Sequence, residues 1–349
     1  MQQVKVYEFG PPGNLVLEDV PTPEPGPGQV RVRLTSIGMN YAELMGRQGY
    51  YRASTGDPPF TPGIEGGGVV DAVGRGVDAS RIGQRVTLGP DVPRGVAGPQ
   101  GGTYRSHVVV NAATALPAPE RIPDDQLGAV ILPYFTAWGC LVHHHGIKPG
   151  DIVGIPAASS SVGLAAAQVV KHFGAVPIGL TSSPQKVDAI RALDTNAFEH
   201  LVVTHDRNND QRVMRPWHSD IKRITDGHGV DVFFDPVAAG EYLSTEIRCL
   251  ATGGTIYIYG LLGEPGPVDM SYMLIKQATM RGWMLYELVT AGESVWRPIT
   301  EAIFDAFRSG VFRQQLAATF RLGEVQKAHE QMERGEHIGK LVLIPDGTG

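Results

Sequence analysis

Between residues 150 and 260, short apolar runs alternate with segments of helical periodicity, and this alternation constrains the fold more than any other feature. Parallel strands need a crossover connection, usually a helix, so the pattern predicts βαβ units in a doubly wound parallel sheet with helices on both faces. The predicted strands are 151–157, 176–181, 231–237 and 254–260, and the predicted helices are 127–145, 161–173, 183–193 and 239–250. The polar segment 204–220 is interpreted as a surface excursion on that sheet.

The first 128 residues differ, because Gly and Pro interrupt short β-like runs and few helical periods occur. This composition predicts a β-rich domain, such as a partly open barrel. Its predicted strands lie within 29–40, 66–78, 83–90 and 101–110. From about 275 the chain is mixed, with strands at 279–285 and 339–344 and helices at 294–308 and 323–334. In one interpretation the chain leaves the β-rich domain (1–128), builds the α/β domain (129–274) and returns (275–349).

The net charge of the 349-residue chain is −6, so no broad basic face is expected. Neither nucleic acid nor an anionic membrane is therefore a predicted partner. No apolar run reaches the roughly 20 residues of a membrane span, and the first residues lack the apolar segment of a secretory signal. The only cysteines, Cys140 and Cys249, are too few for a disulfide framework or a thiolate-rich metal site. We expect a cytoplasmic protein.

The segment GIPAASSSVGLAAAQ (154–168) has the order of a strand, a tight turn and a helix. A dinucleotide-binding turn carries three glycines for the turn, for the approach of the pyrophosphate and for close helix packing. Here the three positions are Ala158, Ser160 and Gly163. The small residues keep the first two roles if neither needs a positive φ, and serine hydroxyls add donors to the helix N-terminus. The alternative is an ordinary turn in which serines cap the helix.

The next strand ends in GLTSSPQK (179–186), where NAD-preferring folds place an acidic residue for the ribose. This chain has Thr181, Ser182, Ser183 and Lys186 instead. Hydroxyl groups and one ammonium favour the 2′-phosphate of NADP(H), because a lysine close to a phosphate is attracted by about 4 kcal/mol before solvation is counted. The alternative is that a serine caps the following helix and Lys186 is solvated.

Eight segments in order resemble the medium-chain dehydrogenase/reductase superfamily, and more closely its zinc-free quinone oxidoreductase and enone reductase branch. They are IGMNYAELMGRQGYY, PGIEGGGVVDAVG, GQRV, LPYFTAWGCL, KPGDIVGIPAASSSVGLAAAQ, GVDVFFDPV, GGTIYIYG and GKLVL. The resemblance covers nearly the whole chain. It implies an α/β fold in which a GroES-like β-rich catalytic domain carries an inserted Rossmann domain, with the active site between them. The family often dimerises by joining sheet edges, so a homodimer through GGTIYIYG as an edge strand is expected.

Zinc-dependent members of that family have a Cys where this chain has Asn40 and a His where it has Ile64. An amide and an aliphatic side chain do not supply the N and S ligands of Zn²⁺. The segment that matches the structural zinc lobe, DVPRGVAGPQGG (91–102), has no Cys, and Glu65 is expected as a structural carboxylate. The three histidines at 143–145 are interpreted as a polar helix end, because consecutive helical residues point about 100° apart. No metal site is predicted.

The resemblance also implies which residues lie at the nicotinamide. Tyr51, Asn40 and Tyr41 are the expected catalytic residues, with Tyr51 as proton donor; for both tyrosines a packing role is the alternative, and Tyr50 makes the register of Tyr51 uncertain. The expected cofactor-binding residues are Asn40, Thr136, Ser159, Ser160, Ser161, Val162, Gly163, Thr181, Ser182, Ser183, Lys186, Tyr259, Gly260, Leu261 and Lys340.

Without a metal, such an enzyme places a hydride donor against an activated acceptor. The predicted function is therefore an NADPH-dependent reductase of small-molecule electrophiles, namely quinones or α,β-unsaturated carbonyl compounds. Two alternatives stay open. One is an enoyl-thioester reductase of a fatty-acid or polyketide pathway, and the other is an NADPH-binding protein without turnover.

Overall fold

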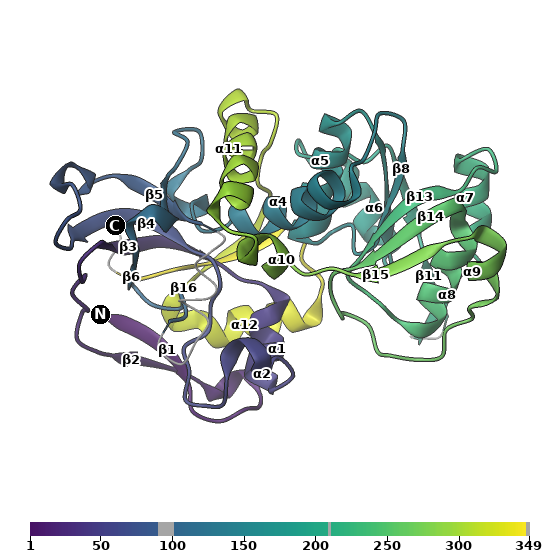
Figure 1. Ribbon diagram of the computed structural model, residues 1–349. Coiled ribbons are helices and arrows are strands. Elements are labelled where there is room, and N and C mark those ends of the chain that lie inside the picture. Colours follow the sequence, from purple (N-terminus) through teal and green to yellow (C-terminus); the bar gives the residue numbers. More distant parts are fainter. Residues whose placement is uncertain (90–100, 209–210, 347–349) are drawn as a thin grey trace. The chain divides into compact units, whose positions relative to one another are not determined.

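The computed structural model describes residues 1–89, 101–208 and 211–346 (Figure 1). The chain divides into two compact units, each described here by itself. The first comprises Met1–Leu132, Trp296–Gly310 and Gln314–Gly349, and the second comprises Pro133–Val295 and Val311–Arg313. This division falls near residues 132 and 295. The domain boundaries expected from the sequence lie near residues 128 and 274, and they stay a prediction.

The second unit is built on a six-stranded sheet in which every neighbouring pair is parallel. In spatial order its strands are β10 (His200–Val203), β9 (Val176–Thr181), β8 (Ile152–Ile155), β13 (Val230–Asp235), β14 (Leu250–Ile258) and β15 (Thr279–Gly282). The chain runs outward from β8 to β10 and then outward from β13 to β15 on the other side. The predicted doubly wound Rossmann topology is confirmed, with its switch point between β8 and β13.

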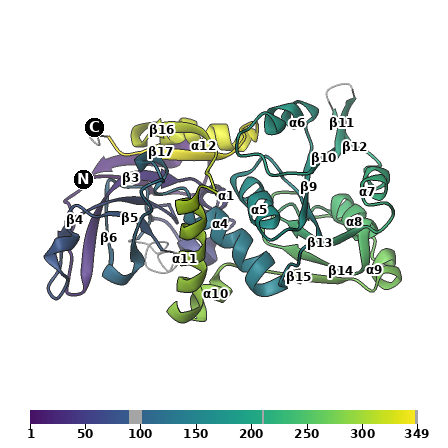
Figure 2. The ribbon, with the colours of Figure 1, turned by 90° about the horizontal axis from the view of Figure 1, so that it is seen from above.

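Helices cover both faces of this sheet, with α5 on one face and α7, α8 and α9 on the other (Figures 1 and 2). The helices of the unit are α4 (Ile131–Ala137), which begins in the first unit, η5 (Trp138–His145), α5 (Ser161–His172), α6 (Pro184–Arg191), α7 (His218–Ile224), α8 (Gly240–Cys249), α9 (Ser271–Lys276) and α10 (Tyr286–Thr290). The predicted helix 127–145 begins later, at Ile131, and continues as the π-helical segment η5 from Trp138. Gly146 ends it with φ +74°.

One expectation for this unit is wrong, and one predicted surface segment contains a hairpin that the sequence did not indicate. The segment GGTIYIYG is not an edge strand, because β14 pairs with β13 on one side and with β15 on the other. Among the described strands, β10 and β15 form the two edges of this sheet. The sequence did not indicate that β15 pairs with β14, because a long connection separates the two strands. Part of the excursion 204–220 forms a hairpin of β11 (His205–Asn208) and β12 (Gln211–Met214), with 209–210 outside the described residues.

The first unit is β-rich and centred on β3 (Gln29–Gly38), which pairs with β4, β6 and β17. Its other strands are β1 (Gln2–Val6), β2 (Leu15–Asp19), β4 (Gly67–Val73), β5 (Arg85–Leu88), β6 (His107–Asn111), β7 (Ala115–Pro117), β16 (Leu316–Arg321) and β17 (Lys340–Ile344). Its helices are α1 (Tyr41–Gln48), α2 (Arg52–Thr55), α11 (Glu293–Ser309, whose first residues belong to the second unit) and α12 (Val325–Arg334). The predicted return of the chain after the α/β segment is visible in β17, which lies against β3.

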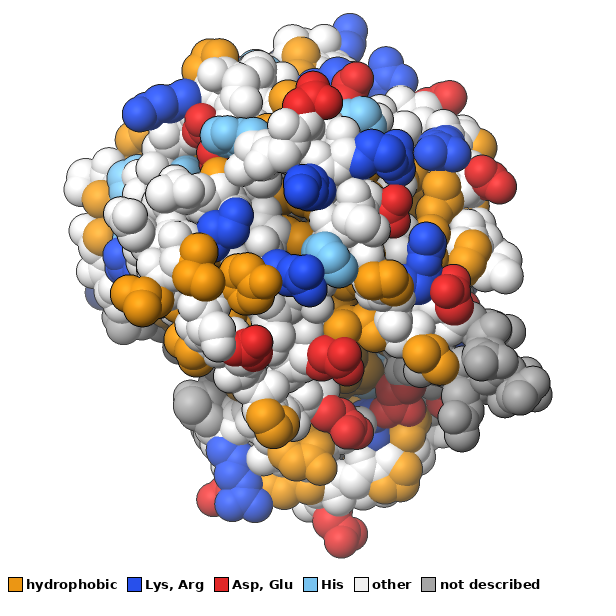
Figure 3. Space-filling model, turned by 90° about the vertical axis from the view of Figure 1, so that its right-hand side faces the viewer, with side chains coloured by type: hydrophobic (Ala, Val, Ile, Leu, Met, Phe, Trp, Pro, Cys, Tyr) orange, Lys and Arg blue, Asp and Glu red, His pale blue; other side chains and the backbone are white. Residues whose placement is uncertain are grey.

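Alternation along β3 places Val30, Val32 and Leu34 in the core of the first unit. The β-rich architecture of the first unit is that of the GroES-like domain that the resemblance implies. Acidic and basic side chains are mixed on the face shown in Figure 3, without a continuous basic area. Within the described ranges, none of the helices combines the length and the apolar character that a membrane crossing requires.

Candidate functional site

The turn after β8 has the geometry of a phosphate-binding turn. The left-handed residue is Ala157, with φ +49°, so neither Ala158 nor Ser160 needs a positive φ. Ser160 is the N-cap of α5, and its Oγ accepts a hydrogen bond from the Gly163 N–H at 3.0 Å. A Cβ at Gly163 would lie 2.7 Å from the Ala157 carbonyl oxygen, so this glycine allows the close helix packing assigned to the third glycine. The capping alternative is therefore also true of Ser160.

Lys186 links this turn to the end of β9. Its Nζ donates a hydrogen bond to Ser159 Oγ at 2.9 Å, across 27 residues of sequence. Thr181 is buried and its Oγ1 accepts from the Ser183 N–H at 3.3 Å, and Ser183 precedes α6 without capping it through its side chain. The structure thus brings Lys186, one of the predicted 2′-phosphate residues, to the predicted pyrophosphate turn, where its side chain is half-buried. Its contact with a 2′-phosphate stays a prediction.

The loops that follow β13 and β14 lie at the same edge of the sheet as that turn, because all three strands are parallel. The Tyr259 N–H donates to the Asp235 carbonyl at 2.9 Å, and its ring stacks on Phe234 at 3.9 Å between centroids. A Cβ at Gly260 would lie 3.0 Å from the Pro236 carbonyl oxygen, whereas Leu261 is exposed. In an open α/β sheet, ligands bind outside the carboxyl ends of the strands at the switch point.

The other predicted cofactor residues of the second unit have distinct environments. Ser161 and Val162 are half-buried in the first turn of α5, and Ser182 is half-buried after β9. Thr136 is buried within α4. Their contacts with a cofactor stay a prediction.

In the first unit, Asn40 and Lys340 lie together although 300 residues separate them. The Lys340 ammonium donates to Asn40 Oδ1 and forms an ion pair with Glu65, and both charged side chains are buried. Gly38 makes room for this pair, because a Cβ there would lie 2.5 Å from Glu65 Oε1. Glu65 also accepts from the Leu132 N–H at 3.2 Å, which agrees with its expected structural role.

Glu43 completes this cluster and was not among the predicted site residues. It accepts hydrogen bonds from the Asn40 N–H at 2.7 Å and the Ile64 N–H at 3.1 Å. Burial raises the pKa of Glu43 to about 7, although the positive charge of Lys340 opposes this rise. The sequence did contain a signal, because an Asn followed three residues later by Glu is typical of a capping box.

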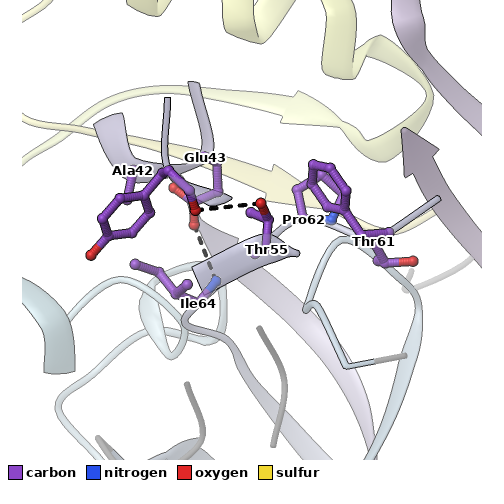
Figure 4. A pocket seen from close by; sticks show the side chains of 9 residues that line it. Ala42, Glu43, Thr55, Thr61, Pro62 and Ile64 are labelled. Carbon is purple, nitrogen blue, oxygen red and sulfur yellow. Dashed lines mark hydrogen bonds between the residues drawn. The ribbon is translucent and has the colours of Figure 1, made fainter. Parts of the chain in front are cut away.

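Glu43 lines a pocket of the first unit together with Tyr51 (Figure 4). The remaining walls are Ala42, Thr55, Phe60, Thr61, Pro62, Gly63 and Ile64. Tyr50 is 76% exposed and does not line the pocket, so the structure favours Tyr51 in the predicted register. Tyr41 opens α1 and is exposed.

The two positions that correspond to zinc ligands in zinc-dependent members of the family, Asn40 and Ile64, have other partners here. Asn40 engages Lys340, and the Ile64 N–H engages Glu43. In the part of the chain that the structure describes, no three His, Cys, Asp or Glu side chains gather as a metal site. Residues 91–100, which include most of the segment that matches the zinc lobe, lie outside the described ranges. The rings of His144 and His145 both pack against Tyr257, and their polar contacts differ: His144 lies 3.4 Å from Glu287, and His145 lies 3.4 Å from the Tyr257 hydroxyl.

Comparison with known proteins agrees with this architecture. Residues 26–120 match the model of the alcohol dehydrogenase GroES-like domain, and residues 161–304 match that of the zinc-binding dehydrogenases. A 2-haloacrylate reductase from Burkholderia sp. is 30% identical over 97% of this chain and 98% of its own length. The chain belongs to the medium-chain dehydrogenase/reductase superfamily. It is an oxidoreductase of this superfamily, and it is also similar to the human quinone oxidoreductase, at 28% identity over 99% and 98% of the two chains.

Solved structures of the superfamily show the same fold. An NAD-dependent alcohol dehydrogenase superposes with a TM-score of 0.84 at 27% identity over 99% of both chains. A mycobacterial protein solved in complex with NADPH gives a TM-score of 0.83 at 24% identity over 99% of this chain and 100% of its own.

Proposed function

We propose that this chain is an NADPH-dependent oxidoreductase that reduces quinones or α,β-unsaturated carbonyl compounds by hydride transfer without a metal ion. The observation that carries the cofactor choice is the position of Lys186, which follows the end of β9, where the adenosine ribose of a dinucleotide is bound, and whose ammonium is held there by Ser159. The names of the similar proteins, a quinone oxidoreductase and a 2-haloacrylate reductase, support the substrate class.

The residues of the second unit fit a dinucleotide that carries a 2′-phosphate in addition to its pyrophosphate. The first N–H groups of a helix have no partner within it, so those of Ser161 and Val162 are available to a pyrophosphate, while the Ser160 cap orients the turn. Ser182, Ser183 and Lys186 supply donors for a 2′-phosphate, and the chain has no carboxylate at 181–183 to repel it. Thr181, Ser159 and Gly163 shape the same turns. When bound, NADPH supplies the hydride.

The residues of the first unit would orient the acceptor and supply a proton. Tyr51 donates the proton to the reduced substrate from the pocket that it shares with Glu43. Lys340 holds the Asn40 amide in place, and in this unit we assign Asn40 and Lys340 to the nicotinamide and Tyr41 to the substrate. For the second unit we assign Thr136 and the loop Tyr259–Leu261 to the cofactor. The Asn40 oxygen already accepts from Lys340, which favours the metal-free assignment.

The described pocket walls favour an uncharged electrophile. Apolar groups of Ala42, Phe60, Pro62 and Ile64 alternate with hydroxyl groups, and no lysine or arginine lines the described pocket. Activated alkenes and quinones accept hydride because the negative charge that develops spreads onto oxygen, so hydroxyl donors suffice to stabilise it.

We also propose a cytoplasmic homodimer. Cys140 and Cys249 are both free and buried, which suits a reducing compartment. The edge strand β15 has unpaired backbone groups on one side, and apolar side chains of Leu274 and Ile275 on the adjacent α9 are 85% and 64% exposed. Joining two β15 edges would cover both features, and light scattering of wild type and Leu274→Lys tests this arrangement.

A steady-state kinetic screen tests the function. The purified chain is mixed with NADPH or NADH and with quinones, alkenals, cyclic enones or enoyl thioesters, and loss of the reduced nicotinamide absorbance is followed. We expect turnover with NADPH and a quinone or enone, unchanged after treatment with a zinc chelator. Preference for enoyl thioesters would assign the chain to lipid or polyketide reduction. Tight NADPH binding without turnover on any acceptor would refute the enzymatic function.

A further inference from the structure

Two carboxyl side chains lie against each other inside the second unit. Asp235 and Glu246, called the acid pair below, are both fully buried. Asp235 is the last residue of β13, and because side chains alternate along a strand it shares a face with Phe233. Glu246 lies one helical turn after Tyr242 on the buried face of α8, which covers that side of the sheet. The two carboxyl groups act directly on each other, since each changes the pKa of the other.

A hydrogen bond between two carboxyl groups requires one proton. Asp235 Oδ1 accepts from the Val237 N–H at 2.6 Å, and Oδ2 accepts from the Ala238 N–H at 2.8 Å. Burial raises the pKa of Asp235 to about 6 although these two bonds oppose the rise, so Asp235 is the ionised partner above that pH. In the described chain, no N–H or O–H donates to either oxygen of Glu246. Burial and the Asp235 charge raise the pKa of Glu246 well above its usual value, in agreement with a neutral acid that donates.

The acid pair holds two loops together at the switch point of the sheet. The two hydrogen bonds that Asp235 accepts from backbone N–H groups hold the turn after β13, in which Ala238 has φ +50°. The loop after β14 is attached to this turn by the Leu262 N–H, which donates to the Pro236 carbonyl at 2.8 Å, and by the Gly263 N–H, which donates to the Val237 carbonyl at 2.8 Å. Both loops follow parallel strands at the edge where a dinucleotide binds.

We propose that Glu246 is a positioning residue for the cofactor: its carboxylic acid donates a hydrogen bond to the Asp235 carboxylate and so fixes the two loops that border the nicotinamide half of the crevice. The predicted effect of Glu246 on cofactor affinity rests on the proposed function, which is NADPH binding. The interaction between Asp235 and Glu246 does not depend on NADPH binding. It predicts that loss of the proton at high pH weakens NADPH binding, since two buried charges would then repel each other.

The other titratable groups near the acid pair do not compete for this proton. Burial raises the pKa of Tyr242 and Cys249 on α8, and ionisation of Glu246 would raise both further. Burial and the negative charge of Asp235 raise the pKa of Tyr259. The charged groups Arg248 of α8 and Lys276 of α9 act on Cys249 and not on the pair. The side chains of Tyr242, Cys249 and Tyr259 therefore stay neutral around neutral pH.

The test compares Glu246→Gln, whose amide still donates to Asp235, with Glu246→Leu, which has a similar size and no donor. Glu241→Gln, an exposed change on the same helix, is the matched control. NADPH affinity is measured by nicotinamide fluorescence from about pH 6 to about pH 9. We expect wild type to weaken at the alkaline end, Glu246→Gln to keep the neutral affinity at every pH, and Glu246→Leu to bind at least about tenfold more weakly.

Thermal unfolding of the same proteins without NADPH separates this proposal from the proposed function. Because the raised pKa of Glu246 stabilises the fold mainly at low pH, wild type should lose stability relative to Glu246→Gln as pH rises from about 5 to about 9. Parallel pH profiles for these two proteins, or wild-type NADPH affinity in a folded Glu246→Leu, would overturn the proposal. Failure of wild type to bind NADPH, with diverging unfolding profiles, would refute only the proposed function.

Discussion

Replacing Glu43 by Gln should flatten the pH dependence of stability in a predictable direction. The carboxyl group is buried with the Lys340–Glu65 ion pair nearby, and its pKa lies at about 7, raised by burial from the usual 4.5. A group with a raised pKa in the folded state contributes stability below its unfolded pKa, and this stability is lost as the pH rises to the folded value. Each tenfold difference in proton affinity is worth about 1.4 kcal/mol, so the loss between pH 4.5 and 7 is about 3 kcal/mol.

Urea unfolding at several pH values measures this quantity. Wild type should lose about 3 kcal/mol more than Glu43→Gln between about pH 4.5 and about pH 7, because the amide cannot ionise. The N–H groups of Asn40 and Ile64 donate to different oxygens of Glu43, so the single amide oxygen keeps one of these bonds, and loss of the other lowers the stability of the variant equally at every pH. The exposed Glu120→Gln serves as the control for loss of one negative charge in the same unit. If Glu43→Gln and wild type lose stability in parallel, Glu43 is not the buried acid described here.

Three further changes probe the cofactor and substrate sites. Lys186→Ala should weaken NADPH binding by about tenfold and leave NADH binding unchanged, because a partly solvated ion pair is worth about 1 kcal/mol or slightly more; fluorescence titration with both cofactors checks this, and equal losses would contradict the 2′-phosphate assignment. Tyr51→Phe should lower kcat by about a hundredfold or more at unchanged NADPH affinity, whereas the exposed Tyr50→Phe should not, and stopped-flow reduction kinetics distinguish them. Gly163→Ala places a methyl group 2.7 Å from a backbone oxygen, so both NADPH affinity and the melting temperature should fall by the equivalent of about 1–3 kcal/mol; Gly13→Ala, with open space around it, should change neither.

Much of the fold followed from patterns that are local in sequence. The alternation of strands and helices predicted the parallel sheet, since a period of two or of 3.6 residues reports the local backbone directly. The turn at Ala158–Gly163 was recognisable because small residues and an N-cap act within a few positions. The order of strands across the sheet was not predictable from local periodicity. The sequence suggested β14 as an edge strand, but β15 forms that edge of the sheet.

The sequence by itself determined the two kinds of unit, the phosphate turn and the residue types that surround a cofactor. Only the tertiary structure decided which of these residues meet: Lys340 with Asn40, Lys186 with Ser159, and Asp235 with Glu246. The reason is physical. A buried charge must find a partner because desolvation is costly, but that partner can come from any strand or helix that the fold brings alongside, and no local periodicity encodes the distance across a sheet or between its ends.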